Sequence, residues 1–178
     1  RTNLLPYSDA LTNAKWAFSN VNITVTANNA TGIAGTSTAA TVVETTTSNV
    51  QHRLFYYDAS VSITSGSVYC YSVYLKSIGG RDVQLAPSAG TGLGTTNISF
   101  SKQFASNGWN MEKHGNGIFR VWKSAAATST GIPSFVYYTY NGSSTTFTGT
   151  TGTGFQIEKA QYEQVTTVGD PPTSYIDN

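Results

Sequence analysis

The segment Val68-Tyr69-Cys70-Tyr71-Ser72-Val73-Tyr74-Leu75-Lys76 determines the fold class that we predict for this chain. Val and Tyr dominate it, and the turn-forming stretch Thr64-Ser65-Gly66-Ser67 stands directly before it, a combination typical of a β-strand that follows a turn. Side chains alternate along a strand, so odd-numbered and even-numbered positions face opposite sides of a sheet. We expect the odd-numbered set to lie in the core: Tyr69, Tyr71, Val73 and Leu75. The even-numbered set is expected on the other face, which makes this a central strand: Cys70, Ser72, Tyr74 and Lys76.

Further segments of the same kind stand on either side of this strand. They are short, rich in β-branched and aromatic residues, and separated by stretches of Gly, Ser, Thr and Asn, which is the pattern of strands and turns. The expected strands cover residues 21–27, 40–45, 53–63, 83–86, 98–104, 118–124, 135–140 and 155–162. A helical signal appears once, over residues 8–16, where Ser8 or Asp9 is expected to cap a short turn. About ten short strands with at most one helical turn predict an all-β fold, either a sandwich or a barrel.

Composition limits the size of the domain and the class of partner. The chain has 178 residues, of which 12% are aromatic and 11% charged, and its net charge is +1. A domain of this length buries enough surface for a self-sufficient core, and we expect residues 1–178 to form one domain. The few cations are spread along the sequence, which argues against nucleic-acid binding. No apolar run is long enough to cross a bilayer, so we expect no membrane insertion.

Residues typical of catalysis are scarce. The chain has two histidines and one cysteine, and it contains neither a His-Glu-x-x-His motif nor a Gly-x-Ser-x-Gly motif. Cys70 lies in an apolar run, and we expect it to be buried and unreactive. Glu158 and Glu163 are the candidate pair of carboxylates for a glycosidase, but their odd spacing places them on opposite faces of a regular strand. We therefore predict that the chain is not an enzyme.

With few catalytic residues in the chain, the aromatic side chains are the main candidates for binding a ligand. Flat rings stack against the C–H face of a pyranose, while amide and hydroxyl groups bind the sugar hydroxyls. In residues 135–140 aromatic side chains occupy both faces of the expected strand, so one face belongs to a surface, a groove or an interface. The alternative for most of these rings is the core, because a sandwich must fill two inner faces. The candidates for glycan binding are Tyr57, Tyr74, Trp109, Trp122, Tyr138 and Tyr140.

Several motifs, in order along nearly the whole chain, together resemble one family. They are Asn3-Leu4-Leu5-Pro6-Tyr7-Ser8-Asp9 running to Trp16, residues 64–69 followed by Ser72-Val73-Tyr74-Leu75-Lys76, Asn116-Gly117-Ile118-Phe119-Arg120-Val121, Phe155-Gln156-Ile157-Glu158-Lys159-Ala160-Gln161-Tyr162-Glu163, and Pro172-Thr173-Ser174-Tyr175-Ile176. This ordered set is similar to the carbohydrate-binding-like domains of tailed-phage virion proteins, such as tail-fibre, tail-spike and head-fibre modules. The resemblance implies a jelly-roll β-sandwich, similar to the carbohydrate-binding modules of polysaccharidases. It also implies a location on the surface of a phage particle, within a larger virion protein.

Two positions of the sequence depart from the family pattern. Ile118 stands where the family has Trp, and Glu158-Lys159 replaces Trp-Gly, so a ligand site built on those aromatic residues would be altered.

Many relatives hold a structural calcium between the amino-terminal segment and the last strand. By that analogy Asp9 and Glu163 are candidate calcium ligands, because calcium takes carboxylate oxygens. The alternative is that Glu163 accepts hydrogen bonds from backbone N–H groups of the opening segment.

The closing residues 169–176 include two adjacent prolines, which fix φ and remove backbone donors. We expect this segment to run extended across the sandwich, with Tyr175 and Ile176 near Leu4 and Leu5. That arrangement would bring the two termini together, as suits a module of a larger fibre.

Three functions remain open at the level of sequence. The first is a glycan-binding adhesion module of a virion appendage that binds a host-surface polysaccharide through exposed aromatic residues. The second is a structural module that decorates a capsid or assembles a fibre, with other virion proteins or a second copy of this chain as partners. The third is an accessory carbohydrate-binding module of a secreted polysaccharidase. Exposed aromatic residues beside amides would favour the first, and aromatic residues in a subunit interface would favour the second.

Overall fold

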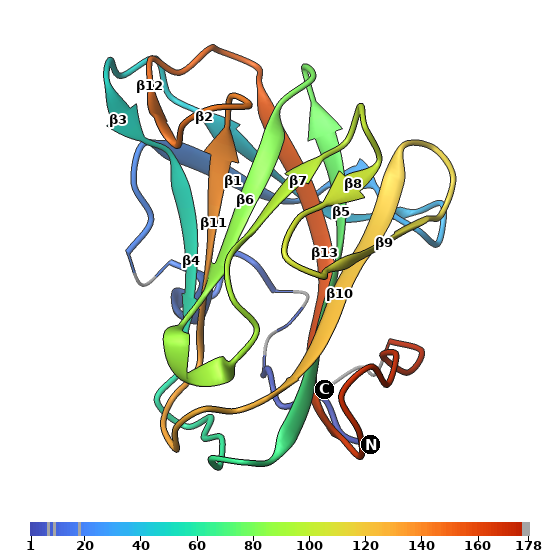
Figure 1. Ribbon diagram of the computed structural model, residues 1–178. Coiled ribbons are helices and arrows are strands. Elements are labelled where there is room, and N and C mark those ends of the chain that lie inside the picture. The colour runs from blue at the N-terminus through green and yellow to red at the C-terminus, as the bar shows by residue number, and fades with distance from the viewer. Residues whose placement is uncertain (7, 9, 18, 176–178) are drawn as a thin grey trace.

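The computed structural model describes residues 1–6, 8, 10–17 and 19–175, and these residues form a sandwich of two antiparallel sheets (Figure 1). The six-stranded sheet has the order β1 (Ile23–Thr31), β2 (Ser37–Glu44), β13 (Gly154–Val165), β5 (Val68–Ile78), β10 (Ile118–Ala126) and β9 (Asn110–Lys113). The five-stranded sheet has the order β4 (Arg53–Tyr57), β11 (Ser134–Tyr140), β6 (Asp82–Pro87), β7 (Thr96–Ser99) and β8 (Phe104–Ala105). A two-stranded sheet, β3 (Val50–Gln51) with β12 (Thr146–Phe147), closes one end. The prediction of an all-β sandwich is confirmed.

The central position of residues 68–76 is also confirmed. They belong to β5, which pairs with β13 on one side and with β10 on the other. The odd-numbered side chains are buried in the core: Tyr69, Tyr71, Val73 and Leu75. On the opposite face Cys70, Ser72 and Tyr74 are buried as well. Cys70 packs against Trp122 and Val165, and the ring of Tyr74 packs against His114 and Arg120.

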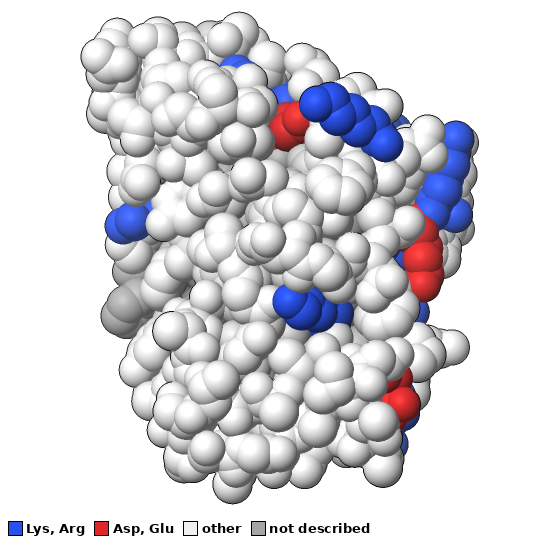
Figure 2. Space-filling view, in the orientation of Figure 1, with Lys and Arg blue, Asp and Glu red and all other residues white. Residues whose placement is uncertain are grey.

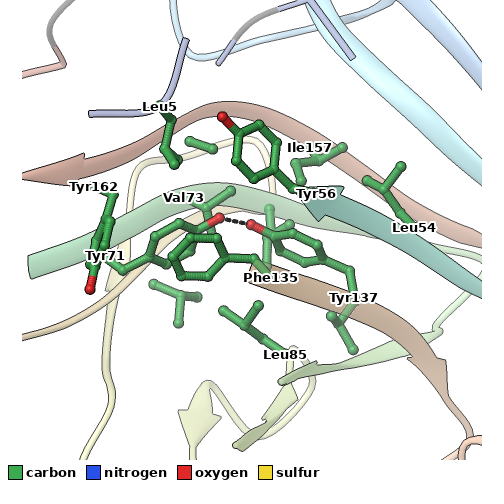
Figure 3. Packing of buried hydrophobic residues seen from close by; sticks show 14 of the residues in the cluster. Leu5, Leu54, Tyr56, Tyr71, Val73, Leu85, Phe135, Tyr137, Ile157 and Tyr162 are labelled. Atoms are coloured by element: carbon green, nitrogen blue, oxygen red, sulfur yellow. Dashed lines mark hydrogen bonds between the residues drawn. The ribbon is translucent and has the colours of Figure 1, made fainter. Parts of the chain in front are cut away.

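The core between the sheets is built around stacked aromatic rings that carry hydroxyl groups (Figure 3). Tyr71 of β5 stacks on Phe135 of β11, with ring centroids 4.0 Å apart. The hydroxyl of Tyr71 forms a hydrogen bond with the hydroxyl of Tyr137, and both rings are fully buried. A buried hydroxyl needs such a partner, because leaving it without one costs free energy. This pair therefore links the two sheets through the centre of the core.

The longest strand, β13, contains a bulge that corrects the expected arrangement of its two glutamates. The register against β5 shifts between Glu158 and Gln161, and Lys159 has a φ of 51°. Because the bulge adds a residue, Glu158 lies opposite Tyr74 and Glu163 lies opposite Cys70. Both glutamates therefore lie on the same, outer face of the six-stranded sheet, and the expectation of opposite faces was wrong.

The termini lie close together, as the closing prolines predicted (Figure 1). The guanidinium of Arg1 donates to the carbonyl of Pro171 at 2.9 Å, and the hydroxyls of Ser8 and Tyr175 are 2.7 Å apart. The carboxylate of Glu163 accepts a bond from the backbone N–H of Thr173 at 2.7 Å, so it fixes the closing segment. Ile176, which was expected beside Leu4 and Leu5, lies outside the described residues.

Helical structure is limited to two short 3-10 turns, η1 (Ala14–Trp16) and η2 (Ala89–Thr91), within the part of the chain that the structure describes. The cap of η1 is Asn13, whose side-chain oxygen accepts from the N–H of Lys15 at 3.0 Å. Ser8 therefore does not cap this turn, and Asp9 lies outside the described residues. In those same residues no helix is long and apolar enough to cross a membrane.

One expected strand is in fact a hairpin. Residues 98–104 were expected to be continuous, whereas the structure has β7 up to Ser99, a turn, and β8 from Phe104. The turn contains Gln103 with a φ of 50°, a conformation that glycine or asparagine usually supplies. Because no Gly or Pro marks the turn, the sequence pattern alone did not indicate it.

Candidate functional site

The outer face of the five-stranded sheet carries a row of aromatic and polar side chains. Tyr138 of β11 lies opposite Arg53 of β4 and opposite Gln84 of β6. Gln84 in turn lies opposite Asn97 of β7, and its amide N–H donates to the Asn97 side-chain oxygen at 2.8 Å. Arg53 is fixed by hydrogen bonds to Ser19. Residues in direct register have neighbouring side chains, so the row places one flat ring beside two amides.

A surface hollow of about 400 Å³ adjoins this row, and we call it the Tyr140 hollow. Tyr140 at the end of β11 and Phe104 of β8 supply its aromatic lining, and the Phe104 side chain is 58% exposed. The other lining residues are small or polar: Asp82, Asn97, Ser99, Ser101, Lys102, Ser106 and Gly142. Asn97 belongs both to the row and to the hollow, so the two form one site.

The site contains one carboxylate and two cations: Asp82 and Lys102 line the hollow, and Arg53 lies in the row. Tyr140 lies opposite Asp82 across β11 and β6, and the Asp82 carboxylate accepts a hydrogen bond from the backbone N–H of Phe100 at 3.0 Å. Figure 2, which views this side of the molecule, shows a mostly uncharged surface, with charged side chains along its upper and right margins, one cation at the left margin and one near the centre. Hydroxyl, amide and aromatic groups in a shallow hollow suit a neutral polar ligand with an apolar face.

The predicted glycan-binding residues do not all meet at this site. Tyr138 and Tyr140 do, on one face of one strand. Tyr57 is half-buried at the far end of β4, opposite Ser134. The remaining three, Tyr74, Trp109 and Trp122, are at most 9% exposed.

Those three rings have structural surroundings that account for their burial. The indole N–H of Trp109 donates to the carbonyl of Gly94 at 3.1 Å, and its ring packs edge-on against Tyr71 in the core. The indole N–H of Trp122 donates to Glu112 at 2.6 Å on the outer face of the other sheet. Burial raises the pKa of Tyr74, whose ring contacts Arg120. None of the three offers an open ring face beside Tyr138.

The residues of the site that the sequence analysis missed include Gln84, Asn97, Phe104 and Asp82. They were missed because strand register, which brings residues distant in sequence side by side, is fixed by long-range pairing. The available signal was the alternation in residues 83–86, which places Gln84 on the face opposite Val83 and Leu85.

The candidate calcium ligand Glu163 is surrounded by donors. Its carboxylate accepts from the amide of Gln161 at 2.8 Å and from the N–H and hydroxyl of Thr173, and the Arg1 guanidinium lies 3.9 Å away. Donors and a cation fit a hydrogen-bonded carboxylate and do not fit a calcium ligand, which needs oxygen neighbours. Among the described residues no three His, Cys, Asp or Glu side chains form a group suited to a metal. Asp9 lies outside those residues, so the calcium site stays a prediction.

Glu163 therefore holds the closing segment, and Asn3 of the opening segment bonds to β13 at another position. The side-chain oxygen of Asn3 accepts from the N–H of Tyr162 at 3.0 Å. The second glutamate of β13, Glu158, accepts from the N–H of Ile33 and from the hydroxyl of Thr38. Each carboxylate of this strand is thus used in fixing a loop.

Comparisons with known proteins identify the fold and leave the family open. No protein-family model matches the chain, and no curated protein matches its sequence significantly. Among solved structures, the enzymatically active domain of tailspike protein 4 from bacteriophage CBA120 is similar with a TM-score of 0.52 and 12% identity. The match covers 92% of this chain and 21% of that one, so this chain spans about a fifth of the tailspike chain.

Two further structures contain xylanase modules. A Clostridium thermocellum endo-1,4-beta-D-xylanase 10B fragment with CBM22-1 and GH10 modules, complexed with xylohexaose, matches with a TM-score of 0.48 and 15% identity. That match covers 88% of this chain and 26% of the other. The CBM22-1 xylan-binding domain of Paenibacillus barcinonensis Xyn10C matches with a TM-score of 0.46 and 10% identity over 82% of both chains. At such identities the tailspike likeness shows a shared fold alone, and the two weaker matches add no argument.

Proposed function

We propose that this chain is a non-catalytic glycan-binding module, which holds a saccharide on the outer face of its five-stranded sheet. The observation that carries the proposal is the Tyr140 hollow together with the adjoining row from Tyr138 to Asn97. It combines aromatic faces with amide, hydroxyl and carboxylate groups on one rigid surface. A sugar ring presents the matching pattern, with C–H groups on its faces and hydroxyls around its edge.

The absence of a carboxylate pair in the site supports a binding role over hydrolysis. Asp82 is the one carboxylate among the residues that line the Tyr140 hollow. Glycoside hydrolysis normally needs two carboxyl groups about 5 to 10 Å apart, on either side of the scissile bond. A module with one carboxylate, itself bonded to a backbone N–H, retains a glycan without cleaving it.

We further propose that the module belongs to a phage virion appendage and binds a host-surface polysaccharide. The ordered motifs of the sequence support this, and the fold shared with a tailspike domain agrees with it. A rigid sheet surface that binds repeating saccharide units weakly suits an appendage with many copies, because avidity then supplies the strength.

Glycan-array binding of the isolated chain tests the proposal, followed by calorimetry with the glycan that binds best. Tyr138→Ala and Tyr140→Ala are expected to weaken binding at least about tenfold each, as removal of a central aromatic contact does. Tyr57→Ala is the matched control, because it removes the same side chain from the far end of the same sheet. Equal losses for all three variants, or none for the first two, would refute the assignment of the site.

The structural-module hypothesis keeps one observation in its favour, the exposed ring of Phe104. In a fibre or capsid that ring would be covered by a neighbouring subunit. Sedimentation of the chain with Phe104→Ser decides between the two. A stable oligomer that this variant dissociates, combined with no binding on the array, would replace the glycan proposal.

A further inference from the structure

The cations of this chain divide into two groups by their partners. Seven of the ten Lys and Arg residues have an ion pair, a hydrogen bond or a ring contact: Arg1, Lys15, Arg53, Arg81, Arg120, Lys123 and Lys159. The other three have no such partner among the described residues: Lys76, Lys102 and Lys113. Cations without partners carry a positive potential that is not neutralised locally.

The three unpaired lysines lie around neighbouring hollows. A second hollow of about 410 Å³ is lined by Lys76 and Lys113, and we call it the lysine hollow. Lys102 lines the Tyr140 hollow, and Ser101 lines both hollows. The turn between β7 and β8 therefore separates the two hollows. Lys102 belongs to this turn, and Lys76 and Lys113 line the lysine hollow.

The lysine hollow combines positive charge with an aromatic wall. Phe100 and Phe119 both line it, with ring centroids 6.1 Å apart and ring planes at 54°. The stem of Lys76 lies over Gly117, where an added Cβ would come within 3.5 Å of the Lys76 Cε. That contact supports the lysine stem at the edge of the hollow, with a hydroxyl from Ser77 also in the lining.

The carboxylates near this region bond to groups other than the three lysines. Asp82 bonds to the N–H of Phe100, and Glu112 accepts from the indole of Trp122 and lies 4.0 Å from His114. Glu158 shares a small surface depression with Lys76 but is bonded to the Ile33 N–H. No Asp or Glu is among the residues that line the lysine hollow. The positive charge of Lys76 and Lys113 is therefore available to an anionic group of a ligand.

We infer that the lysine hollow binds the carboxylate of an acidic sugar residue, so the ligand of the module is an acidic polysaccharide. This inference rests on the proposed function and narrows its substrate class. One sugar ring occupies the Tyr140 hollow, and an acidic unit of the same chain reaches past Ser101 to Lys76 and Lys113. Phe100 and Phe119 contact the apolar face of that unit, while the ammonium groups meet its carboxylate.

The test compares charged and uncharged forms of the same polymers. Polygalacturonate, alginate, hyaluronan and polysialic acid are arrayed, each beside a form whose carboxyl groups have been reduced to alcohols. Carboxyl reduction is expected to weaken binding at least about tenfold, and binding of the native form is expected to weaken as salt screens the charges.

Two double variants that remove the same number of charges at different places show which lysines bind the acidic polymer. The double variant Lys76→Gln/Lys113→Gln is expected to lose about tenfold in affinity for the acidic polymer. Lys123→Gln/Lys159→Gln removes the same charge elsewhere on the surface and is expected to change affinity less than about twofold.

The outcomes separate this inference from the proposed function. Binding to neutral glycans that depends on Tyr138 and is unaffected by Lys76→Gln/Lys113→Gln would leave the proposed function intact and overturn the acidic ligand. Equal losses in both double variants would also overturn it, because the effect would then be one of net charge. Failure of every acidic polymer to bind the folded chain would count against it as well.

Discussion

Replacing Glu44 with Gln is expected to destabilise the fold strongly, because this buried carboxylate at the end of β2 fixes two loops. Its oxygens accept from the guanidinium of Arg81 at 2.5 and 3.0 Å, from the N–H of Thr150 at 2.9 Å and from the hydroxyl of Thr153 at 2.7 Å. The Glu44 side chain is fully buried and that of Arg81 is 16% exposed. A Gln amide would place a donor against these donors and leave the Arg81 charge unpaired.

The expected loss is about 3 kcal/mol, at the lower end of the range for a broken buried pair because Arg81 keeps some contact with water. For a chain of this length that corresponds to a fall in Tm of roughly 6–12 °C. Urea unfolding followed by tryptophan fluorescence measures it. Asp170→Asn is the matched control: it removes the same charge at a pair with Arg1 in which each side chain is 30% exposed, where the cost is under about 1 kcal/mol.

The pH dependence gives this prediction a second readout. Burial alone raises the pKa of Glu44, but its bonds to Arg81, Thr150 and Thr153 outweigh burial and lower the pKa below its ordinary value of 4.5. A carboxyl with a lowered pKa stabilises the fold above that ordinary value and loses its contribution as pH falls through the folded-state pKa. The gap between wild type and Glu44→Gln should therefore be constant near neutral pH and shrink below about pH 4.5. A gap below about 1 kcal/mol at neutral pH, or one that widens on acidification, would refute the reasoning.

Three further predictions concern the core and the closing segment. Tyr71→Phe leaves the buried Tyr137 hydroxyl without its partner and should cost about 1–3 kcal/mol, while adding Tyr137→Phe should restore most of it; additive losses on urea unfolding would contradict this. Burial raises the pKa of the Cys70 thiol to about 12, so a thiol reagent at pH 8 should label it only after unfolding, and rapid labelling of the native chain would contradict the structure. Arg120→Met removes the bonds to Ser72 and to the Thr173 carbonyl, so limited proteolysis of the closing segment should accelerate, and an unchanged cleavage rate would contradict its role.

Local patterns predicted most of the long strands, but they extended β4 six residues past Tyr57 and missed β9. Features that depend on pairing between distant segments were not predictable from them. The alternation of residues 68–76 was sufficient to identify β5 and its core face, because a half-buried strand repeats every two residues. The bulge at Lys159 was not predictable, since no Gly or Asn marks its positive φ. Burial of Cys70 was predicted from the apolar run around it, but its packing against Trp122 and Val165 is a tertiary contact that the sequence did not indicate.

Only the two tyrosines of the site, Tyr138 and Tyr140, were predicted from the sequence. Aromatic residues on both faces of residues 135–140 indicated that Tyr138 and Tyr140 face away from the core, because Phe135 and Tyr137 fill the inner face. The other members of the site, Gln84 and Phe104, reach it through the pairing of β6, β7 and β8. Burial of Trp109 and Trp122 likewise follows from which strands meet. The sequence contains many aromatic residues, and the pairing of the strands determines which of them keep an exposed ring face.

The central claim, that a glycan binds the outer face of the five-stranded sheet, is tested most directly by NMR titration of the labelled chain with its best array glycan. The account predicts that shifts concentrate on β6, β7 and the end of β11, with the side-chain amide signals of Gln84 and Asn97 among the largest. Shifts confined to the six-stranded sheet, or none with a glycan that binds, would contradict it.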